Sequence, residues 1–190
     1  MKPLTPSTPH VIIMVGIPGA GKTTFAENFA KTFKAPYINP RSISDLTGID
    51  EVATEKVTKL LFDQLLKTNR TLIYEGSTYA KAQRTALEQM VRKAGYRSLL
   101  VWVQTDPIES KRRATKKQLD GRHLSAAQFD VAMSQFQNPL PAEKPVVISG
   151  KHTYATQVRA VLKRLAGITP DTPPAPEKPR NITGRNITIR

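Results

Sequence analysis

The segment GIPGAGKT, residues 16–23, restricts the fold of this 190-residue chain more than any other feature. It fills every fixed position of the pattern G-x-x-x-x-G-K-[ST]. A β-branched run, HVIIMV, precedes it, and a helical pattern over residues 20–33 follows. In this context the glycines let backbone N–H groups converge on a phosphate at the start of the helix. A glycine-rich turn that arose by chance would not be expected between a buried strand and an amphipathic helix. The sequence therefore predicts a site that binds a nucleoside triphosphate.

Two side chains of this loop have predicted roles. Lys22 is expected to bridge the β- and γ-phosphates of ATP, and Thr23 to offer its hydroxyl to Mg²⁺. ATP and Mg²⁺ are therefore the expected cofactors, although the loop does not distinguish ATP from GTP. The residues expected to bind the nucleotide are Gly16, Ile17, Pro18, Gly19, Ala20, Gly21, Lys22, Thr23 and Thr24.

Strand and helix patterns alternate along the rest of the chain. The expected strands lie near residues 10–16, 35–39, 70–76, 98–106 and 144–150, with helical patterns between them. This alternation predicts an α/β, three-layer P-loop NTPase fold with a mostly parallel, five-stranded sheet. The helix expected near residues 49–68 is predicted to place these apolar residues on one face: Val52, Val57, Leu60, Leu61 and Leu65.

Composition indicates one globular domain with extensions at both ends. Residues 1–9 hold three prolines and are predicted to be a flexible arm. Residues 10–167 form the expected domain, with a small helical lid at about 107–124, and the Pro-rich residues 168–190 are predicted to be a mobile, basic tail. Such a chain is expected to be a monomer.

The net charge of +14 favours polyanionic partners, such as nucleotides or nucleic acid, over a purely solubilising role. The chain has no cysteine, which fits a reducing cytoplasm. No apolar run reaches the roughly 20 residues needed to cross a bilayer. We therefore expect a cytoplasmic protein without membrane contact.

Two acidic residues follow expected strands. Glu75 ends the third strand pattern, where a carboxylate beside the phosphate loop can hold a water of the Mg²⁺ shell or polarise an acceptor. Asp106 ends the fourth and precedes Pro107, which indicates a helix N-cap instead. Glu75 is therefore the predicted catalytic carboxylate, acting on the metal through water.

Six cations lie close together in the segment ESKRRATKKQLDGRH, residues 109–123. In a phosphoryl-transfer enzyme such a segment can close as a lid, with Arg112 or Arg113 neutralising charge on the transferring phosphate. A solvated basic helix and a phosphate-tracking surface for nucleic acid remain alternatives. The six are Lys111, Arg112, Arg113, Lys116, Lys117 and Arg122.

From His10 to Leu165 the pattern resembles the P-loop kinase family that contains the polynucleotide kinase domains, with zeta toxins and gluconate kinases as more distant relatives. The segments on which this resemblance rests are VGIPGAGKTTFAENFA, YEGSTYAKAQR, VWVQTDPIESKRR and FQNPLPAEKPVVIS. The resemblance implies ATP-dependent phosphotransfer, a lid arginine at Arg112 or Arg113, and a position near the adenine for the last segment. It also aligns Arg84 with an arginine of the helix that follows the third strand.

The chain departs from this family in the stretch YINPRSIS, residues 37–44. The family pattern there has an Asp, which acts as general base, and an Arg, which holds the substrate. Alignment on Ile43 and Gly48 puts Arg41 at the Asp position and Ser44 at the Arg position. A shift of one residue puts Ser42 at the acid position. Arginine cannot accept a proton, so Arg41 either binds an anionic acceptor group or lies on the surface.

Three functions are consistent with these patterns. The leading hypothesis is a phosphotransferase that moves the γ-phosphate of ATP to a hydroxyl of a nucleic acid end, a nucleotide or a small anionic molecule. The second is an ATP- or GTP-binding protein that hydrolyses slowly or not at all. The third is a nucleic-acid binder whose lid and tail supply most of the affinity.

Overall fold

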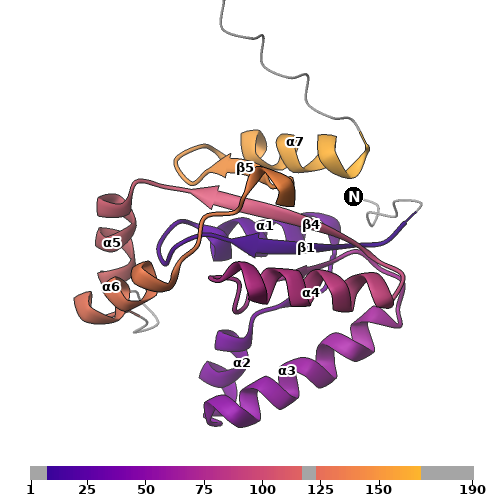
Figure 1. The fold of residues 1–190 in the computed structure, drawn as a ribbon, viewed down its shortest axis with the longest axis horizontal. Helices are drawn as coiled ribbons and strands as arrows, with labels where there is room; N and C mark the ends of the chain where they lie inside the picture. The colour runs from indigo at the N-terminus through magenta and orange to yellow at the C-terminus, as the bar shows by residue number, and fades with distance from the viewer. Residues whose placement is uncertain (1–7, 117–122, 168–190) are drawn as a thin grey trace, which may run out of the picture.

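The sheet of the computed structural model has five strands, and every pairing between neighbours is parallel. The structure describes residues 8–116 and 123–167. The strand order is β2-β3-β1-β4-β5, which places β1 and the phosphate loop at the centre (Figure 1). The strands are β1 His10–Val15, β2 Tyr37–Ile38, β3 Leu72–Tyr74, β4 Arg97–Gln104 and β5 Val146–Ser149. This architecture confirms the predicted three-layer P-loop fold. The predicted flexible arm, apart from Thr8 and Pro9, and the tail lie outside the described residues.

Helices cover both faces of this sheet (Figure 1). They are α1 Lys22–Phe33, α2 Pro40–Thr47, α3 Glu51–Leu66, α4 Lys81–Lys93, α5 Pro107–Thr115, α6 Ala126–Gln135 and α7 Tyr154–Leu165, with a short 3₁₀ turn η1 at Pro141–Glu143. None of the described helices has the combination of length and apolar character that crossing a bilayer requires.

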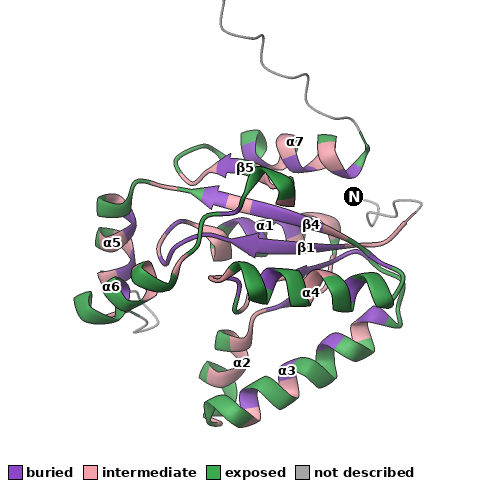
Figure 2. Cartoon of the chain, in the orientation of Figure 1, coloured by how far each residue is buried: buried purple, intermediate pink, exposed green. Residues whose placement is uncertain are grey.

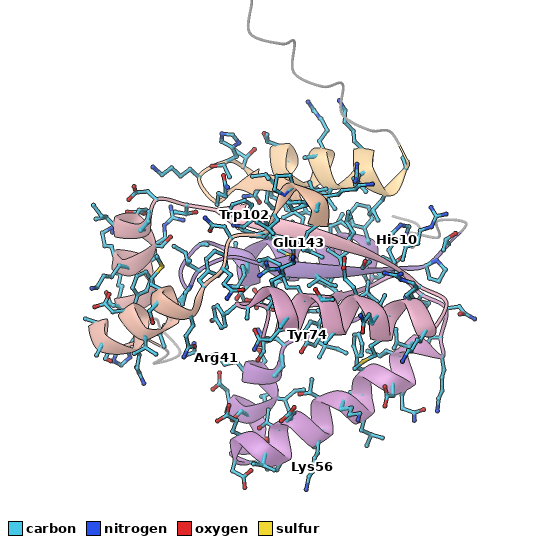
Figure 3. The ribbon with its side chains drawn as sticks, viewed as in Figure 1. His10, Arg41, Lys56, Tyr74, Trp102 and Glu143 are labelled. Atoms are coloured by element: carbon cyan, nitrogen blue, oxygen red, sulfur yellow. The ribbon has the colours of Figure 1, made fainter. Side chains whose placement is uncertain are left out.

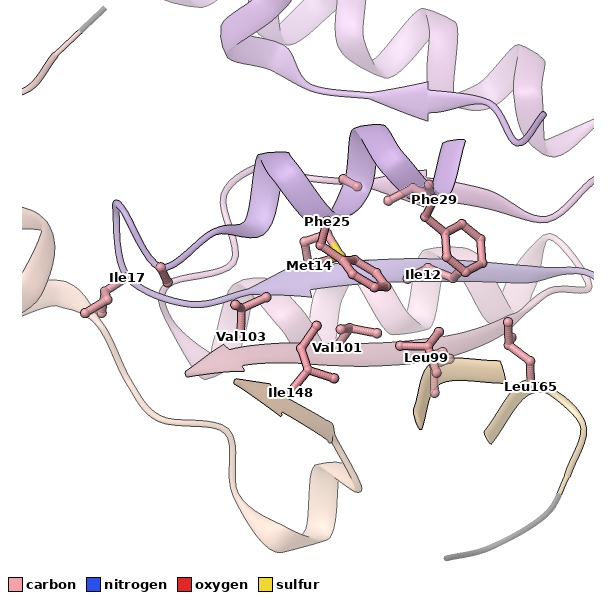
Figure 4. Close-up of a cluster of buried hydrophobic side chains, with 14 of the residues drawn as sticks. Ile12, Met14, Ile17, Phe25, Phe29, Leu99, Val101, Val103, Ile148 and Leu165 are labelled. Atoms are coloured by element: carbon pink, nitrogen blue, oxygen red, sulfur yellow. The ribbon is translucent and has the colours of Figure 1, made fainter. Parts of the chain in front are cut away.

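The central strand β1 divides its side chains between two cores. Val11, Ile13 and Val15 pack with residues of α3 and α4 on one face, while Ile12 and Met14 pack with residues of α1 and α7 on the other. All five are fully buried, each contributing about 1.5–3 kcal/mol of hydrophobic stabilisation. Figure 4 shows the second core, where Phe25 and Phe29 of α1 lie over Ile12 and Met14. Burial on both faces explains why β1 is a continuous apolar run.

The predicted buried face of α3 is wrong. The helix buries Thr54, Thr58, Phe62 and Leu66, whereas Val52 is 63% exposed and Leu60 60% exposed. Much of α3 is exposed, as the green segments of Figure 2 show. The buried residues follow a spacing of four, and the two threonines satisfy their hydroxyls by donating to backbone carbonyls one turn earlier. Threonine can therefore occupy this face, and a search for apolar periodicity does not find it.

The predicted helix cap at Asp106 is present, and two other helix ends have equally clear local causes. The Asp106 carboxylate accepts hydrogen bonds from the backbone of Ile108 and Glu109, and so caps α5. Ser125 caps α6 through the backbone N–H of Gln128. Gly95 follows α4 with a φ of 81°, a conformation that favours glycine.

Candidate functional site

The phosphate loop leaves the carboxyl end of β1 and leads directly into α1. Three of its glycines adopt positive φ: Gly16 at 149°, Gly19 at 76° and Gly21 at 105°. Gly21 is the N-cap residue of α1, so the first turn of the helix points its backbone N–H groups toward the loop. An anion in the loop would gain both these donors and the favourable end of the helix dipole.

Residues of neighbouring elements contact the backbone of the loop and hold it in place. Thr105, after β4, donates from its hydroxyl to the Ala20 carbonyl at 2.9 Å. A Cβ on Gly150 would lie 2.0 Å from that same carbonyl oxygen, and a Cβ on Gly19 would lie 2.2 Å from the Ser110 carbonyl of α5. The loop therefore packs backbone against backbone at two points, which gives it a single rigid shape.

Gly19 is a variable position in the loop pattern, yet this structure requires glycine there. We expect Gly19→Ala to destabilise the fold and reduce nucleotide affinity by at least about tenfold, because its positive φ and the Ser110 carbonyl both oppose a Cβ. Urea unfolding and nucleotide titration measure the two effects. Gly48→Ala is the matched control, since Gly48 also has positive φ, 67°, but no atom lies within 4 Å of its Cβ position. Equal losses in both variants would contradict the packing argument.

Glu75 lies opposite the loop, and both of its carboxylate oxygens are hydrogen-bonded. The Thr23 hydroxyl donates to Oε1 at 2.8 Å, and the Tyr37 hydroxyl donates to Oε2 at 2.6 Å. Asn39 in turn donates from Nδ2 to the Tyr37 oxygen at 3.0 Å. Burial, and then the Glu75 charge, raise the pKa of Tyr37, so the phenol remains a donor throughout the physiological range. The carboxylate is thus held in one orientation beside Thr23.

Lys22 bends back over the loop. Its Nζ donates to the Gly16 carbonyl at 2.9 Å and the Ile17 carbonyl at 3.0 Å. Desolvation lowers the pKa of this ammonium, and the nearby Glu75 charge opposes that shift. A phosphate in the loop would replace two neutral carbonyls with a charged acceptor, which strengthens the hydrogen bonds of an ammonium.

A cleft of about 680 Å³ opens in front of the loop. Its walls come from the phosphate loop, α1, the start of α2, the segment after β3, α5 and the region around α6. The lining residues are Pro18, Gly19, Gly21, Lys22, Thr23, Thr24, Glu27, Asn39, Pro40, Arg41, Glu75, Gly76, Ser77, Tyr79, Arg113, Ala114, His123, Leu124, Gln128 and Ala132. Lys22, Thr23, Glu75 and Arg113 among the expected catalytic and metal residues therefore share one cleft.

The two lid arginines differ in position. Arg113 lines the cleft and donates from Nη1 to the Gly150 carbonyl at 3.2 Å, while its Nε pairs with Glu109 at 2.7 Å. Arg112 does not line the cleft; its side chain is 67% exposed and also pairs with Glu109. These two arginines lower the pKa of Glu109 to about 2. The structure therefore brings Arg113, and not Arg112, to the phosphate loop.

Three further side chains at or behind the cleft were absent from the sequence predictions. Glu27 contributes a second carboxylate to the lining, Tyr79 lines the wall after β3, and Tyr37 fixes Glu75 without lining the cleft itself. Glu27 could have been found, because it stands four residues after Thr23 on the same helical face. Tyr37 and Tyr79 carry no such signal, since the pairing of β3 with β1, and of β2 with β3, brings their segments to the loop.

Arg84 supports the segment after β3 from within the fold. It is fully buried and pairs with Glu143 through Nε at 2.7 Å. Its Nη1 donates to the carbonyls of Thr78, Tyr79 and Gln137. Arg84 therefore joins the cleft wall to the connection that leads into β5, and its role is structural.

The donor set fits a Mg²⁺ ion that binds together with a nucleotide. Within residues 8–116 and 123–167, no group of three or more His, Cys, Asp or Glu side chains is suited to hold a metal. Mg²⁺ typically takes one or two protein oxygens and completes its shell with phosphates and water. The Thr23 hydroxyl and the Glu75 carboxylate, 2.8 Å apart, match this requirement.

Comparisons with known proteins agree with this fold. Three of the solved structures that share it are described below. Chaetomium thermophilum Kti12 in complex with ADP-AlF3 has a TM-score of 0.65 at 16% identity, over 84% of this chain and 100% of that one. A gluconokinase from Sinorhizobium meliloti 1021 has a TM-score of 0.58 at 15% identity, over 85% of this chain and 93% of that one. A sugar kinase from Janibacter sp. HTCC2649 has a TM-score of 0.59 at 16% identity, over 86% and 96%.

A comparison with curated proteins finds no significant match. The family model described as "AAA domain" matches residues 11–139, which is more than half of the chain and includes the phosphate loop, Glu75 and Arg113. The chain therefore belongs to this AAA domain family and has a P-loop kinase-like, nucleotide-binding fold.

Proposed function

We propose that this protein is an ATP- and Mg²⁺-dependent phosphotransferase that moves the γ-phosphate to a hydroxyl of a nucleic acid end, a nucleotide or a small anionic molecule. The observation that carries the proposal is the contact between Thr23 and Glu75 beside Lys22, in a cleft that also admits Arg113. The active unit is residues 10–167, with the lid at about 107–124. The protein acts as a monomer in the cytoplasm.

Each residue has a proposed role in this transfer. The nucleotide-binding residues are those of the loop, 16–24, with Lys22 on the β- and γ-phosphates. Thr23 binds Mg²⁺ directly, and Glu75 binds it through water. Arg113 neutralises charge that develops on the transferring group. Since Arg112 points away from the cleft, we assign the lid function to Arg113.

The chemistry is an in-line displacement at phosphorus. The acceptor oxygen bonds to the γ-phosphorus as the bond to the β–γ bridging oxygen breaks, and ADP leaves. The hydroxyl proton moves onto the transferred phosphoryl group and then to solvent. Glu75 does not take this proton in the proposal, because it keeps its negative charge to hold Mg²⁺ through water.

Incubation with γ-labelled ATP and a panel of hydroxyl acceptors tests the proposal. We expect label on an acceptor with the unchanged protein and none with Lys22→Ala. Absence of label from every acceptor, with identical behaviour of the variant, would contradict the proposal.

One observation favours a second function, nucleotide binding with slow hydrolysis and no kinase activity. Arg41 lines the cleft, at the position where the resemblance places a general base. This alternative expects release of inorganic phosphate from ATP without labelled acceptor. Arg41→Asp separates the two, because a gain in transfer would indicate a kinase that has lost its base.

Tyr37 gives a separate test of the metal site. We expect Tyr37→Phe to raise the Mg²⁺ concentration for half-maximal nucleotide turnover about tenfold, because Glu75 loses the donor that orients it. Nucleotide affinity without Mg²⁺ should stay close to that of the unchanged protein. Tyr154→Phe is the matched control, since its hydroxyl bonds to Thr32 outside the cleft. An unchanged Mg²⁺ requirement in Tyr37→Phe would show that Tyr37 does not position the carboxylate.

A further inference from the structure

Arg41 is held at the edge of the cleft by the start of α2. Asn39 caps this helix, and its side-chain oxygen accepts the Arg41 backbone N–H at 3.0 Å. The same Asn39 side chain donates to Tyr37, which bonds to Glu75. The backbone of Arg41 is thus linked through two hydrogen-bonded side chains to the carboxylate beside the phosphate loop. Figure 3 shows Arg41 in the space between α2 and α6, and its side chain is part of the cleft lining.

The cleft holds three cations among its described residues, and they come from different elements. Lys22 begins α1, Arg113 belongs to α5, and Arg41 belongs to α2. Lys22 donates to carbonyls of the phosphate loop, and Arg113 donates to the Gly150 carbonyl. A triphosphate in the loop would replace the partners of Lys22 and would lie next to that of Arg113. Arg41 has no contact with these loop carbonyls. The positive charge of Arg41 is therefore better placed to bind a second anion than to bind the triphosphate.

Tyr79 lies on the same side of the cleft. Burial raises the pKa of its phenol, the Glu75 charge adds to this, and the Arg41 charge opposes it. Tyr79, Arg41 and Glu75 all line this cleft. The backbone of Tyr79 is fixed by the buried Arg84 and by Gln137, which bond to its carbonyl. The exposed Arg41 guanidinium, the phenol of Tyr79 on a fixed backbone segment and the Glu75 carboxylate, which has its own partners, thus line the same cleft.

We infer that Arg41 and Tyr79 form an anion subsite for the acceptor, so that the acceptor carries a phosphate or carboxylate in addition to its reacting hydroxyl. This inference rests on the proposed function, because it assigns the ligand of the same cleft. A guanidinium binds either oxyanion with two parallel hydrogen bonds, and a phenol supplies one more. Such a subsite lowers the KM for an anionic acceptor and aligns its hydroxyl with the γ-phosphate.

Binding of matched probes tests the subsite without requiring turnover. The protein is first saturated with ADP and Mg²⁺, which occupies the phosphate loop. Calorimetry then compares thymidine with thymidine 3′-monophosphate for the phosphate arm, and sorbitol with gluconate for the carboxylate arm. We expect the charged member of at least one pair to bind about tenfold more tightly than its neutral partner. The arm that shows this preference identifies the oxyanion.

Variants separate a specific subsite from general charge attraction. Arg41→Gln should abolish the preference for the charged probe, and Arg41→Lys should retain part of it. Arg159→Gln removes one exposed cation from α7, outside the cleft, and should leave the preference unchanged. No preference in the unchanged protein, or the same preference in Arg41→Gln, would overturn the inference.

The label-transfer assay distinguishes this failure from failure of the proposed function. Transfer to charged and neutral acceptors with equal KM would overturn the subsite and leave the phosphotransferase intact. A binding preference that depends on Arg41, without transfer to any acceptor, would support the subsite and overturn the phosphotransferase.

Discussion

Replacement of Lys22 with alanine is expected to reduce nucleotide turnover by at least about 100-fold, the effect of removing one preorganised charge from a transition state. The ammonium lies over the loop, bonded to the Gly16 and Ile17 carbonyls, and is positioned to exchange them for phosphate oxygens. Its loss removes positive charge where negative charge develops on the β–γ bridge. Release of labelled phosphate, with and without acceptor, measures the change at saturating ATP and Mg²⁺.

Lys31→Ala is the matched control for this variant. Lys31 belongs to the last turn of α1, is exposed, and does not line the cleft. Lys31→Ala lowers the net charge by the same amount as Lys22→Ala but removes no side chain from the cleft. It should therefore leave turnover unchanged. Lys22→Ala should also unfold at nearly the same urea concentration as the unchanged protein. Equal turnover in Lys22→Ala and Lys31→Ala would show that the loop lysine does not contact the phosphates.

Arg84→Met is expected to lower the free energy of unfolding by about 3–5 kcal/mol, since removal of one partner leaves a buried charge uncompensated. The Arg84 side chain is 0% exposed and that of Glu143 9%. The Thr78 and Gln137 carbonyls also lose the Arg84 donor in this variant, and the Tyr79 carbonyl keeps only the Gln137 N–H. Urea unfolding followed by circular dichroism measures the loss. A loss below 1 kcal/mol, on the scale of an exposed ion pair, would contradict this reading.

A double-mutant cycle and a pH series sharpen this test. Arg84→Met with Glu143→Met should be more stable than the sum of the two single losses predicts, because neither charge remains. The hydrogen bond from Arg84 lowers the pKa of Glu143. A carboxyl whose folded pKa is depressed contributes stability above its unfolded pKa and loses it as pH falls through the folded value. The stability difference between the unchanged protein and Glu143→Gln should therefore shrink below about pH 4.

The sequence predicted the strands more accurately than the helix faces. Strand β1 is apolar at every position after His10 because both of its faces are buried, so its identity does not depend on orientation. Helix α3 buries one narrow line that contains Thr54 and Thr58, while Val52 and Leu60 are exposed. Hydrophobic periodicity predicts that a helix is present but not which face a neighbouring element covers.

Helix α2 shows a similar limit for the candidate site. The sequence predicts a strand near residues 35–39 and has no acid in the stretch YINPRSIS, and the structure adds a helix that begins at Pro40. The cap at Asn39 fixes the backbone of Arg41, and the same Asn39 side chain donates to Tyr37. The sequence left open whether Arg41 binds an anionic acceptor group or lies on the surface; in the structure Arg41 is exposed and lines the cleft.

The sequence by itself determined the nucleotide loop, the parallel α/β fold and the carboxylate at Glu75, because each depends on local spacing between one strand and the next helix. Only the tertiary structure showed that Arg113 and not Arg112 lines the cleft, brought Tyr37 to Glu75 and made Arg41 part of the cleft lining. These outcomes depend on the strand order β2-β3-β1-β4-β5. This order brings Tyr37 and Glu75, which are 38 residues apart in the sequence, into contact. Spacing along the chain does not encode such contacts; the packing of the sheet and its helices does.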